Sequence, residues 1–165
     1  ACKILKDKNI DFTYTIIAAG NVPEALLFQR HQLNLEKEVI FESILPQDQL
    51  LKKMQKFDVL LLPSLEEGIA NVVLEAIALG VPVISTNCGG MSEVVIHKKT
   101  GWLVPVMEVE SIVNAILEVY KTPLKKLQEI SQNAYDLVKK EFNEAKGIEQ
   151  FLEFYDSIYR NSIQK

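Results

Sequence analysis

The chain has 165 residues, of which 48% are hydrophobic and 24% charged, and its formal net charge is -4. This composition is globular with enough apolar residues for a sizeable core, and it argues against a nucleic-acid-binding protein, so we expect one domain over residues 1–165. The two cysteines are far apart and there are only two histidines, so we expect neither a disulfide framework nor a bound metal. No apolar run reaches the length of a membrane span, and we expect a cytoplasmic protein.

The first residues, Ala1 to Leu5, lack an initiating methionine and already have the pattern of an amphipathic helix, which ends near Asn9. Because a domain seldom starts in the middle of a helix, we expect the chain to be a fragment of a longer protein. Its first strand would then lie upstream of Ala1.

Downstream, apolar strand-like runs alternate with segments of helical spacing. Strands are expected at 13–19, 38–41, 59–63, 82–86 and 101–104, and helices at 23–33, 47–56, 70–79, 91–96, 109–120, 123–140 and 144–159. Runs that are apolar throughout are typical of strands buried on both faces of a parallel sheet. We therefore expect an α/β fold, a Rossmann-like doubly wound parallel sheet with helices on both faces and extra helices at the carboxyl terminus. Such folds bind ligands beyond the carboxyl ends of their strands.

The most informative segment lies between the third and fourth expected strands, at residues 66–80. Its helix is expected to begin at Gly68, and the free N–H groups of a helix start form an anion-binding site. Glu67 precedes this helix and Glu75 lies about two turns into it, so helical rise predicts a separation of roughly 10 Å between them. That spacing suits a ligand with hydroxyls at both ends and a phosphate between them.

Each glutamate also has a purely structural interpretation. Almost all neighbours of Glu75 are apolar, so its carboxylate either needs a partner or shares a narrow solvated stripe with Asn71, and the sequence leaves both open. Glu67 could instead complete a capping box with Ser64, although Gly68 in the first turn argues against that simple account.

Two glycine-containing turns carry weaker signals. Cys88-Gly89-Gly90 precedes the next expected helix and could offer a second set of backbone N–H groups, or it could be an ordinary turn. Gly20, which follows the first strand, is weaker still.

Several motifs, in this order, resemble the carboxy-terminal domain of retaining GT-B glycosyltransferases (glycosyltransferase group 1, family 4-like). The motifs are the runs 63–68, 74–76, 80–84, Gly89-Gly90-x-x-Glu93 and 101–105. Glu67 and Glu75 fit that family's pair of glutamates separated by seven residues. The resemblance runs from about Thr13 to Tyr120, and it implies the carboxy-terminal half of a GT-B fold.

The resemblance implies a role for each candidate residue. Glu75 would accept hydrogen bonds from the ribose of a nucleotide-sugar donor, and Glu67, the catalytic candidate, would meet hydroxyls of the transferred sugar. The remaining donor-binding candidates are the amides of Gly68, Ile69, Ala70 and Asn71 for sugar and diphosphate, and Ser43, Ile44, Leu45 and Gly20 on the nucleobase side. The departing phosphate would be stabilised electrostatically, and no cofactor or metal is implied.

The chain departs from the family pattern in three ways. The family's Arg and Lys pair, which neutralises the diphosphate, would lie upstream of Ala1, and the field near Glu66 and Glu67 is acidic. Ser43 replaces a usual glycine, and the turn at 18–21 is less glycine-rich than usual. The amino-terminal domain that would bind a glycan or lipid-linked acceptor is missing.

These departures keep two alternatives to a transferase open. One is a non-catalytic nucleotide-binding or regulatory module of the same fold, and the other is a nucleotide-sugar epimerase. If the protein attaches to the inner face of the membrane, the missing domain would provide the attachment.

Overall fold

The computed structural model describes residues 1–163, and the side chains at 157 and 160–163 are not described; residues 164 and 165 of the expected domain lie outside the described residues. The strands are β1 Tyr14–Ala18, β2 Val39–Ser43, β3 Leu60–Leu62, β4 Val83–Thr86 and β5 Trp102–Val104. The helices are α1 Cys2–Asp7, α2 Glu24–Gln32, α3 Gln47–Met54, α4 Asn71–Ala78, α5 Met91–Val94, α6 Val109–Lys121, α7 Leu124–Glu141 and α8 Glu144–Ile163. Every strand and helix expected from the sequence is present, and strands alternate with helices from β1 to α6.

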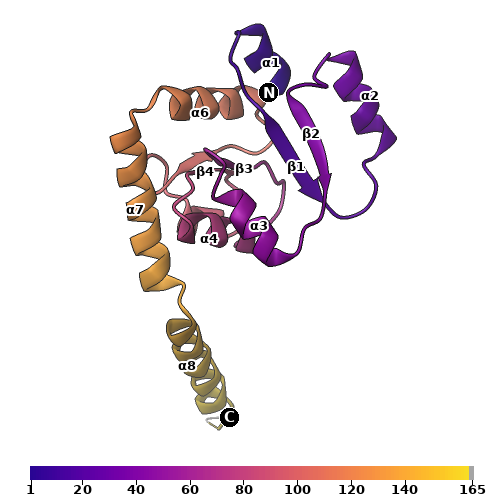
Figure 1. Cartoon of the computed structure of the whole chain (residues 1–165). Helices are drawn as coiled ribbons and strands as arrows, with labels where there is room; N and C mark the ends of the chain where they lie inside the picture. Colours follow the sequence, from indigo (N-terminus) through magenta and orange to yellow (C-terminus); the bar gives the residue numbers. More distant parts are fainter. Residues whose placement is uncertain (164–165) are drawn as a thin grey trace.

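Strands β3, β4 and β5 form a parallel sheet with helices on both faces (Figure 1). Side chains at alternate strand positions enter two separate hydrophobic clusters. On one face, Val83 packs with helix α4 through Val73 and Ile77. On the other face, Ile84 and Trp102 pack with residues of helix α6. The doubly wound arrangement expected from the sequence is therefore present.

Strand β4 explains why the apolar runs do not alternate with polar residues. All four of its residues are buried, because β3 and β5 flank it and a helix covers each face. Even the polar residues Ser85 and Thr86 are buried, and Thr86 finds hydrogen-bond partners there.

The parallel strands do not form one continuous ladder. Strands β1 and β2 pair with each other from Tyr14 opposite Val39 to Ala18 opposite Ser43, and they form a sheet of their own. In the part of the chain that the structure describes, no strand pairing joins β1 to β3. The described strands thus form two sheets, and the chain passes from the first to the second through α3, between β2 and β3.

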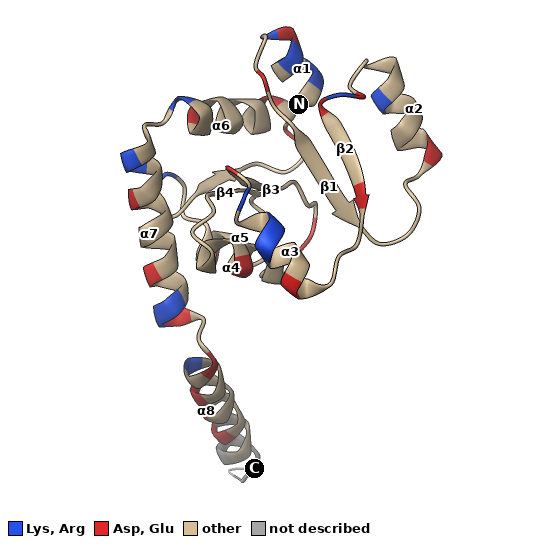
Figure 2. Ribbon diagram, in the orientation of Figure 1, with Lys and Arg blue, Asp and Glu red and all other residues tan. Residues whose placement is uncertain are grey.

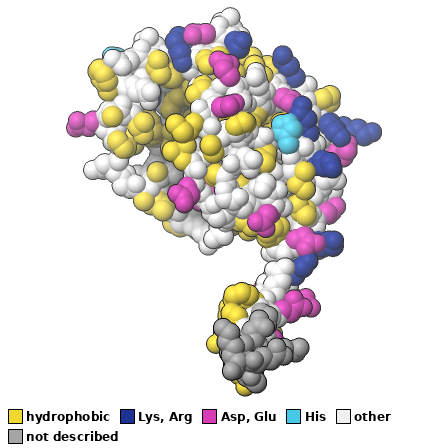
Figure 3. Space-filling model, turned by 180° about the vertical axis from the view of Figure 1, so that it is seen from behind, with side chains coloured by type: hydrophobic (Ala, Val, Ile, Leu, Met, Phe, Trp, Pro, Cys, Tyr) yellow, Lys and Arg dark blue, Asp and Glu magenta, His cyan; other side chains and the backbone are white. Residues whose placement is uncertain are grey.

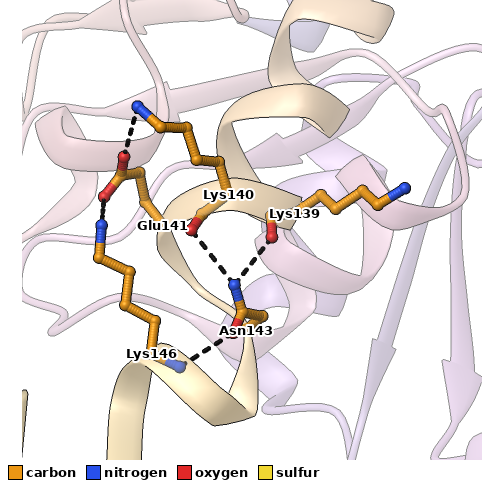
Figure 4. A network of polar contacts seen from close by, with 5 residues as sticks. All are labelled: Lys139, Lys140, Glu141, Asn143 and Lys146. Carbon is orange, nitrogen blue, oxygen red and sulfur yellow. Dashed lines mark hydrogen bonds and ion pairs between the residues drawn. The ribbon is translucent and has the colours of Figure 1, made fainter. Parts of the chain in front are cut away.

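The last two helices continue beyond the sheet. Helix α7 packs against α4, whereas α8 extends away from the rest of the molecule (Figure 1). Asn143 fixes the junction between them (Figure 4): its Nδ2 donates to the carbonyls of Lys139 and Lys140, and its Oδ1 accepts from the Lys146 amide. Glu141 adds ion pairs with Lys140 and Lys146. Over the described residues, no helix combines the length and apolarity that crossing a membrane requires.

Candidate functional site

The loop from β3 to α4 carries the first candidate residues, and it differs from the sequence expectation at its end. Helix α4 begins at Asn71, within one residue of the range 70–79 expected from the sequence, whereas the start at Gly68 is wrong, because Ala70 is extended with φ -70° and ψ 123°. Glu67 therefore lies outside the helix, and helical rise does not set its distance from Glu75. No side chain caps the helix start, so its first N–H groups remain available to a ligand.

Glu67 is held inside this loop by a side-chain contact. Its Oε1 accepts a hydrogen bond of 2.9 Å from the hydroxyl of Ser64. This is not the capping box considered from the sequence, in which each side chain would bond a backbone amide of a helix start. The contact instead fixes the carboxylate of Glu67, which is half-buried.

A buried hydroxyl ties the same loop to the next strand. Thr86, the last residue of β4, donates to the carbonyl of Ser64 at 2.5 Å, and the carbonyl of Leu62 lies 3.4 Å away. Because Thr86 is only 1% exposed, this hydroxyl has no competing water to bond. The carboxyl end of β4 is therefore joined to the carboxyl end of β3 and to the loop that carries Glu67.

The glycine pair after β4 lets the two loops touch. Gly89 has φ +50°, and a Cβ built there would lie 1.6 Å from the carbonyl oxygen of Glu67. Gly90 donates its amide to the carbonyl of Gly68 at 3.1 Å, and a Cβ there would lie 2.8 Å from the Ile69 side chain. The pair thus supports the Glu67 loop, and the Gly90 amide is already used within the protein rather than offered to a ligand.

Glu75 faces the start of helix α3. Its Oε1 accepts a hydrogen bond of 2.9 Å from the Nε2 of Gln47, and the side chain is half-buried. Asn71, one turn earlier, is exposed. The glutamate is therefore a partnered carboxylate at the rim of the site rather than a member of a fully solvated stripe.

The candidate residues of the nucleobase side lie just ahead of that contact. Ser43 ends β2, and Ile44 and Leu45 lead into Pro46 and Gln47 at the start of α3. Ile44 is 66% exposed, which is unusual for isoleucine and leaves its apolar surface open to a ligand. The Gln47–Glu75 contact brings this segment beside α4.

Gly20 is less constrained by the structure. It follows β1 with φ +82°, a conformation that favours glycine, and a Cβ there would meet nothing within 4 Å. The structure places it at the carboxyl end of β1, on the smaller sheet, without a described contact to the Glu67 loop.

The charges around the candidate site are mainly acidic. Glu66 is exposed beside the half-buried Glu67. Among the residues that the structure describes, the ion pairs do not include Glu66, Glu67 or Glu75, and the lysines of α3 pair with carboxylates of α3 and β2 (Figure 2). The described side chains contain no group of three or more His, Cys, Asp or Glu that could hold a metal ion.

Sequence reasoning missed two supporting residues. Gln47 contacts Glu75 across 28 positions, and no local pattern announces such a contact. The sequence pattern marks Thr86 only as the end of a strand. The two hydroxyl residues Ser85 and Thr86 at the carboxyl end of a strand that begins apolar are the signal that could identify it.

Comparisons with known proteins show which family the chain belongs to. Residues 1–137 match the family described as "Glycosyl transferases group 1". The amylovoran biosynthesis glycosyltransferase AmsK of Erwinia amylovora is 33% identical over 125 residues, which are 72% of this chain and 31% of AmsK. The chain thus spans about a third of the length of this curated relative.

Solved structures show the same fold. The C-terminal domain of the group 1 glycosyl transferase LpcC from Francisella tularensis superposes with a TM-score of 0.66 and 21% identity, over 87% of this chain and 93% of that one. HepE from Anabaena, solved in complex with UDP-glucose, superposes with a TM-score of 0.74 and 19% identity, over 94% of this chain and 52% of that one. The chain belongs to the group 1 glycosyl transferase family and has the α/β fold of a GT-B carboxy-terminal domain.

Proposed function

We propose that this chain is the donor-binding domain of a retaining, hexosyltransferase-type glycosyltransferase, which moves a sugar from a nucleoside-diphosphate sugar to a glycan or lipid-linked acceptor. One observation carries the proposal. Two half-buried carboxylates, Glu67 and Glu75, lie on either side of the uncapped start of α4, at the carboxyl edge of the larger parallel sheet. The complex of HepE with UDP-glucose supports a nucleotide-sugar ligand for this fold.

Glu75 is assigned to the ribose. A carboxylate accepts hydrogen bonds from two vicinal hydroxyls, and Gln47 already donates to one of its oxygens and holds its orientation. The neighbouring segment, Ser43 to Leu45, is assigned to the nucleobase side together with Gly20, which follows the strand paired with β2.

Glu67 is assigned to hydroxyls of the transferred sugar. Ser64 fixes its carboxylate, and the close contact with Gly89 fixes its backbone. Next to it, the amides of Gly68, Ile69, Ala70 and Asn71 would donate to the sugar and the diphosphate. Preorganised amides stabilise the negative charge that develops on the leaving phosphate as the glycosidic bond breaks.

The rest of the proposed machinery comes from outside this chain. The acidic surroundings of Glu66 and Glu67 require cations for the diphosphate, and we place these and the acceptor site in the remainder of a longer protein. We accordingly expect that residues 1–165 alone transfer no sugar and that the enzyme needs no metal cofactor. We also expect a cytoplasmic enzyme, in which any attachment to a membrane surface depends on the amino-terminal acceptor domain. Measurable turnover by the purified chain would contradict this division of labour.

Calorimetry on the full-length parent protein tests the assignment of Glu75. Glu75→Gln should weaken the binding of UDP, GDP or ADP, whichever binds the wild type best, by about 1–3 kcal/mol, because a charge-assisted hydrogen bond is lost. Glu66→Gln is the matched control: it removes the same charge from an exposed neighbour and should leave the affinity nearly unchanged. Equal losses in both variants would show that only the local field matters, and no loss in either would remove Glu75 from the site.

A further inference from the structure

A glutamine links two helices that border the candidate site. Gln47 is the first residue of α3, and its Nε2 donates a hydrogen bond of 2.9 Å to the Oε1 of Glu75 on α4. The two residues are 28 positions apart in the chain. Another glutamine–carboxylate bond among the described residues, from Gln132 to Asp136, joins neighbours about one turn apart on α7. The Gln47 contact, in contrast, depends on how the fold places α3 beside α4.

The packing of α3 fixes the position of Gln47. At the far end of this helix, Met54 is buried in the hydrophobic cluster that also holds the inner face of α4. One residue earlier, Lys53 forms an ion pair with Glu42 of β2. Helix α3 is thus held on α4 and on β2, so the side chain of Gln47 extends from a fixed backbone.

The bond to Glu75 uses only part of the hydrogen-bonding capacity of Gln47. A glutamine amide has two N–H donors and a carbonyl acceptor, and this bond takes one donor. Gln47 is exposed, so its second N–H and its carbonyl are open to a ligand. The carboxylate of Glu75 only accepts hydrogen bonds, and its Oε2 has no part in the contact with Gln47. The pair therefore presents a donor beside an acceptor.

A donor beside an acceptor recognises both hydrogen-bonding functions of a hydroxyl group. A sugar hydroxyl donates through its O–H and accepts through its lone pairs. Glu75 can accept from the O–H but cannot donate to the hydroxyl oxygen, whereas the second N–H of Gln47 can. A hydroxyl between the two side chains is therefore satisfied in both directions. A ligand that lacks this hydroxyl leaves both side chains without that partner, which is the basis of strong discrimination.

The cavity of the molecule lies at the other edge of the sheet. It has a volume of about 930 Å³, and its lining includes the apolar residues Phe12, Val59 and Leu127. Because Phe12 and Val59 lie just before β1 and β3, this cavity is at the amino ends of the strands. In the view from behind, hydrophobic side chains surround a recess (Figure 3). Apolar walls select shape rather than hydroxyl groups, so hydroxyl recognition belongs to the carboxyl edge, where Gln47 and Glu75 lie.

We propose that Gln47 determines specificity for the 2′-hydroxyl of the donor's ribose, an inference that rests on the proposed binding of this ribose at Glu75. Gln47 follows the segment Ser43 to Leu45, which is assigned to the nucleobase, and therefore lies on the nucleobase side of Glu75. In a nucleotide, the 2′-carbon is bonded to the carbon that carries the base, so the 2′-hydroxyl is the ribose hydroxyl nearer the base. This hydroxyl donates to Glu75 and accepts from Gln47, whereas the 3′-hydroxyl meets the carboxylate alone.

Calorimetry on the full-length parent protein tests this with three forms of one nucleotide. The ligands are UDP, GDP or ADP, whichever binds best, and its 2′-deoxy and 3′-deoxy analogues. The wild type should bind the 2′-deoxy form about 10- to 100-fold more weakly, because a hydrogen bond to a charged group is lost. Gln47→Met keeps a similar length but removes the donor, so binding of the ribonucleotide should weaken about 3- to 10-fold. Its binding of the 2′-deoxy form should change less than about twofold, and the discrimination against the 3′-deoxy form should stay as in the wild type.

Gln49→Met is the matched control, because Gln49 is another exposed glutamine of α3, and it should leave all three affinities unchanged. If Gln47→Met weakens the ribonucleotide and the 2′-deoxy form equally, Gln47 only holds Glu75 or α3 in place, and the proposal is overturned. Unchanged affinity for all three ligands in Gln47→Met overturns it as well. Either outcome leaves the proposed function standing as long as Glu75→Gln weakens binding. A wild-type protein that binds none of the nucleotides would overturn both.

Discussion

The contact between Gly89 and the backbone of Glu67 gives the sharpest prediction from this structure. In Gly89→Ala, the new Cβ would lie 1.6 Å from the Glu67 carbonyl oxygen and 2.8 Å from its carbon, both under the 3.0 Å that real Cβ atoms respect. Since the obstacle is backbone, no side chain can swing aside, and the Glu67 loop must move.

Two effects add up in this variant. A left-handed φ of +50° costs a residue with a side chain roughly 1–2 kcal/mol. Forcing extra volume into a packed contact costs about 1–3 kcal/mol. We therefore expect Gly89→Ala to lower the free energy of unfolding by about 2–5 kcal/mol.

Two other glycines separate these effects. Gly80 has φ +77° but nothing within 4 Å of its Cβ position, so Gly80→Ala should cost only the conformational part, about 1–2 kcal/mol. Gly68 has neither a left-handed φ nor a neighbour within 4 Å, and Gly68→Ala should change stability by less than about 0.5 kcal/mol.

Urea denaturation of the three variants measures the differences through the transition midpoint at constant slope. The excess loss in Gly89→Ala over Gly80→Ala isolates the clash with Glu67. If Gly89→Ala is no less stable than Gly80→Ala, the two loops do not touch and the proposed support of Glu67 is refuted.

Three further predictions concern the loop anchor and the helix junction. Thr86→Val should lower the free energy of unfolding by about 1–3 kcal/mol, because the carbonyl of Ser64 loses its buried donor. Thr86→Ser keeps the hydroxyl and should lose clearly less stability, so equal denaturation midpoints for the two variants would contradict this. Asn143→Ala removes a side-chain cap from both α7 and α8 and should lower helix stability by about 0.5–2 kcal/mol. The amides at the start of α8 should then exchange faster, whereas those of α4 should be unchanged. Lys146 and Lys140 hold the pKa of Glu141 below its usual value, so their stabilisation is present above the unfolded pKa and is lost as the pH falls below about 4. The protection factors of amides at the α7–α8 junction, corrected for the intrinsic pH dependence of exchange, should then fall, whereas those of a Glu141→Gln variant should not respond to this pH change.

The sequence predicted the helices and strands well because their signals are local. Apolar runs bounded by glycine, proline and polar residues located β1 through β5, and the lack of apolar–polar alternation at 82–86 correctly indicated that β4 is buried on both faces.

Predictions that depended on contacts between distant segments failed or could not be made. Gly68 suggested a helix start, whereas the glycine that close approach requires is Gly89, which meets the loop from another strand. The Ser64-x-x-Glu67 pattern is local, and the capping box that it could form, which Gly68 argued against, is replaced by a direct bond between the two side chains. The division of the sheet had no local signal, since β1 and β3 have the composition of paired strands.

The two sheets differ in how much they bury, and this difference has a consequence for ligand affinity. Helix α2 buries none of its side chains, and β1 and β2 are mostly half-buried, whereas β4 and the inner face of α4 form the core. Local unfolding free energies follow such burial, so the unit β1–α2–β2 should open far more often than the rest. A ligand that spans both units must first order the looser one, and any substitution that rigidifies α2 should tighten binding without touching the ligand.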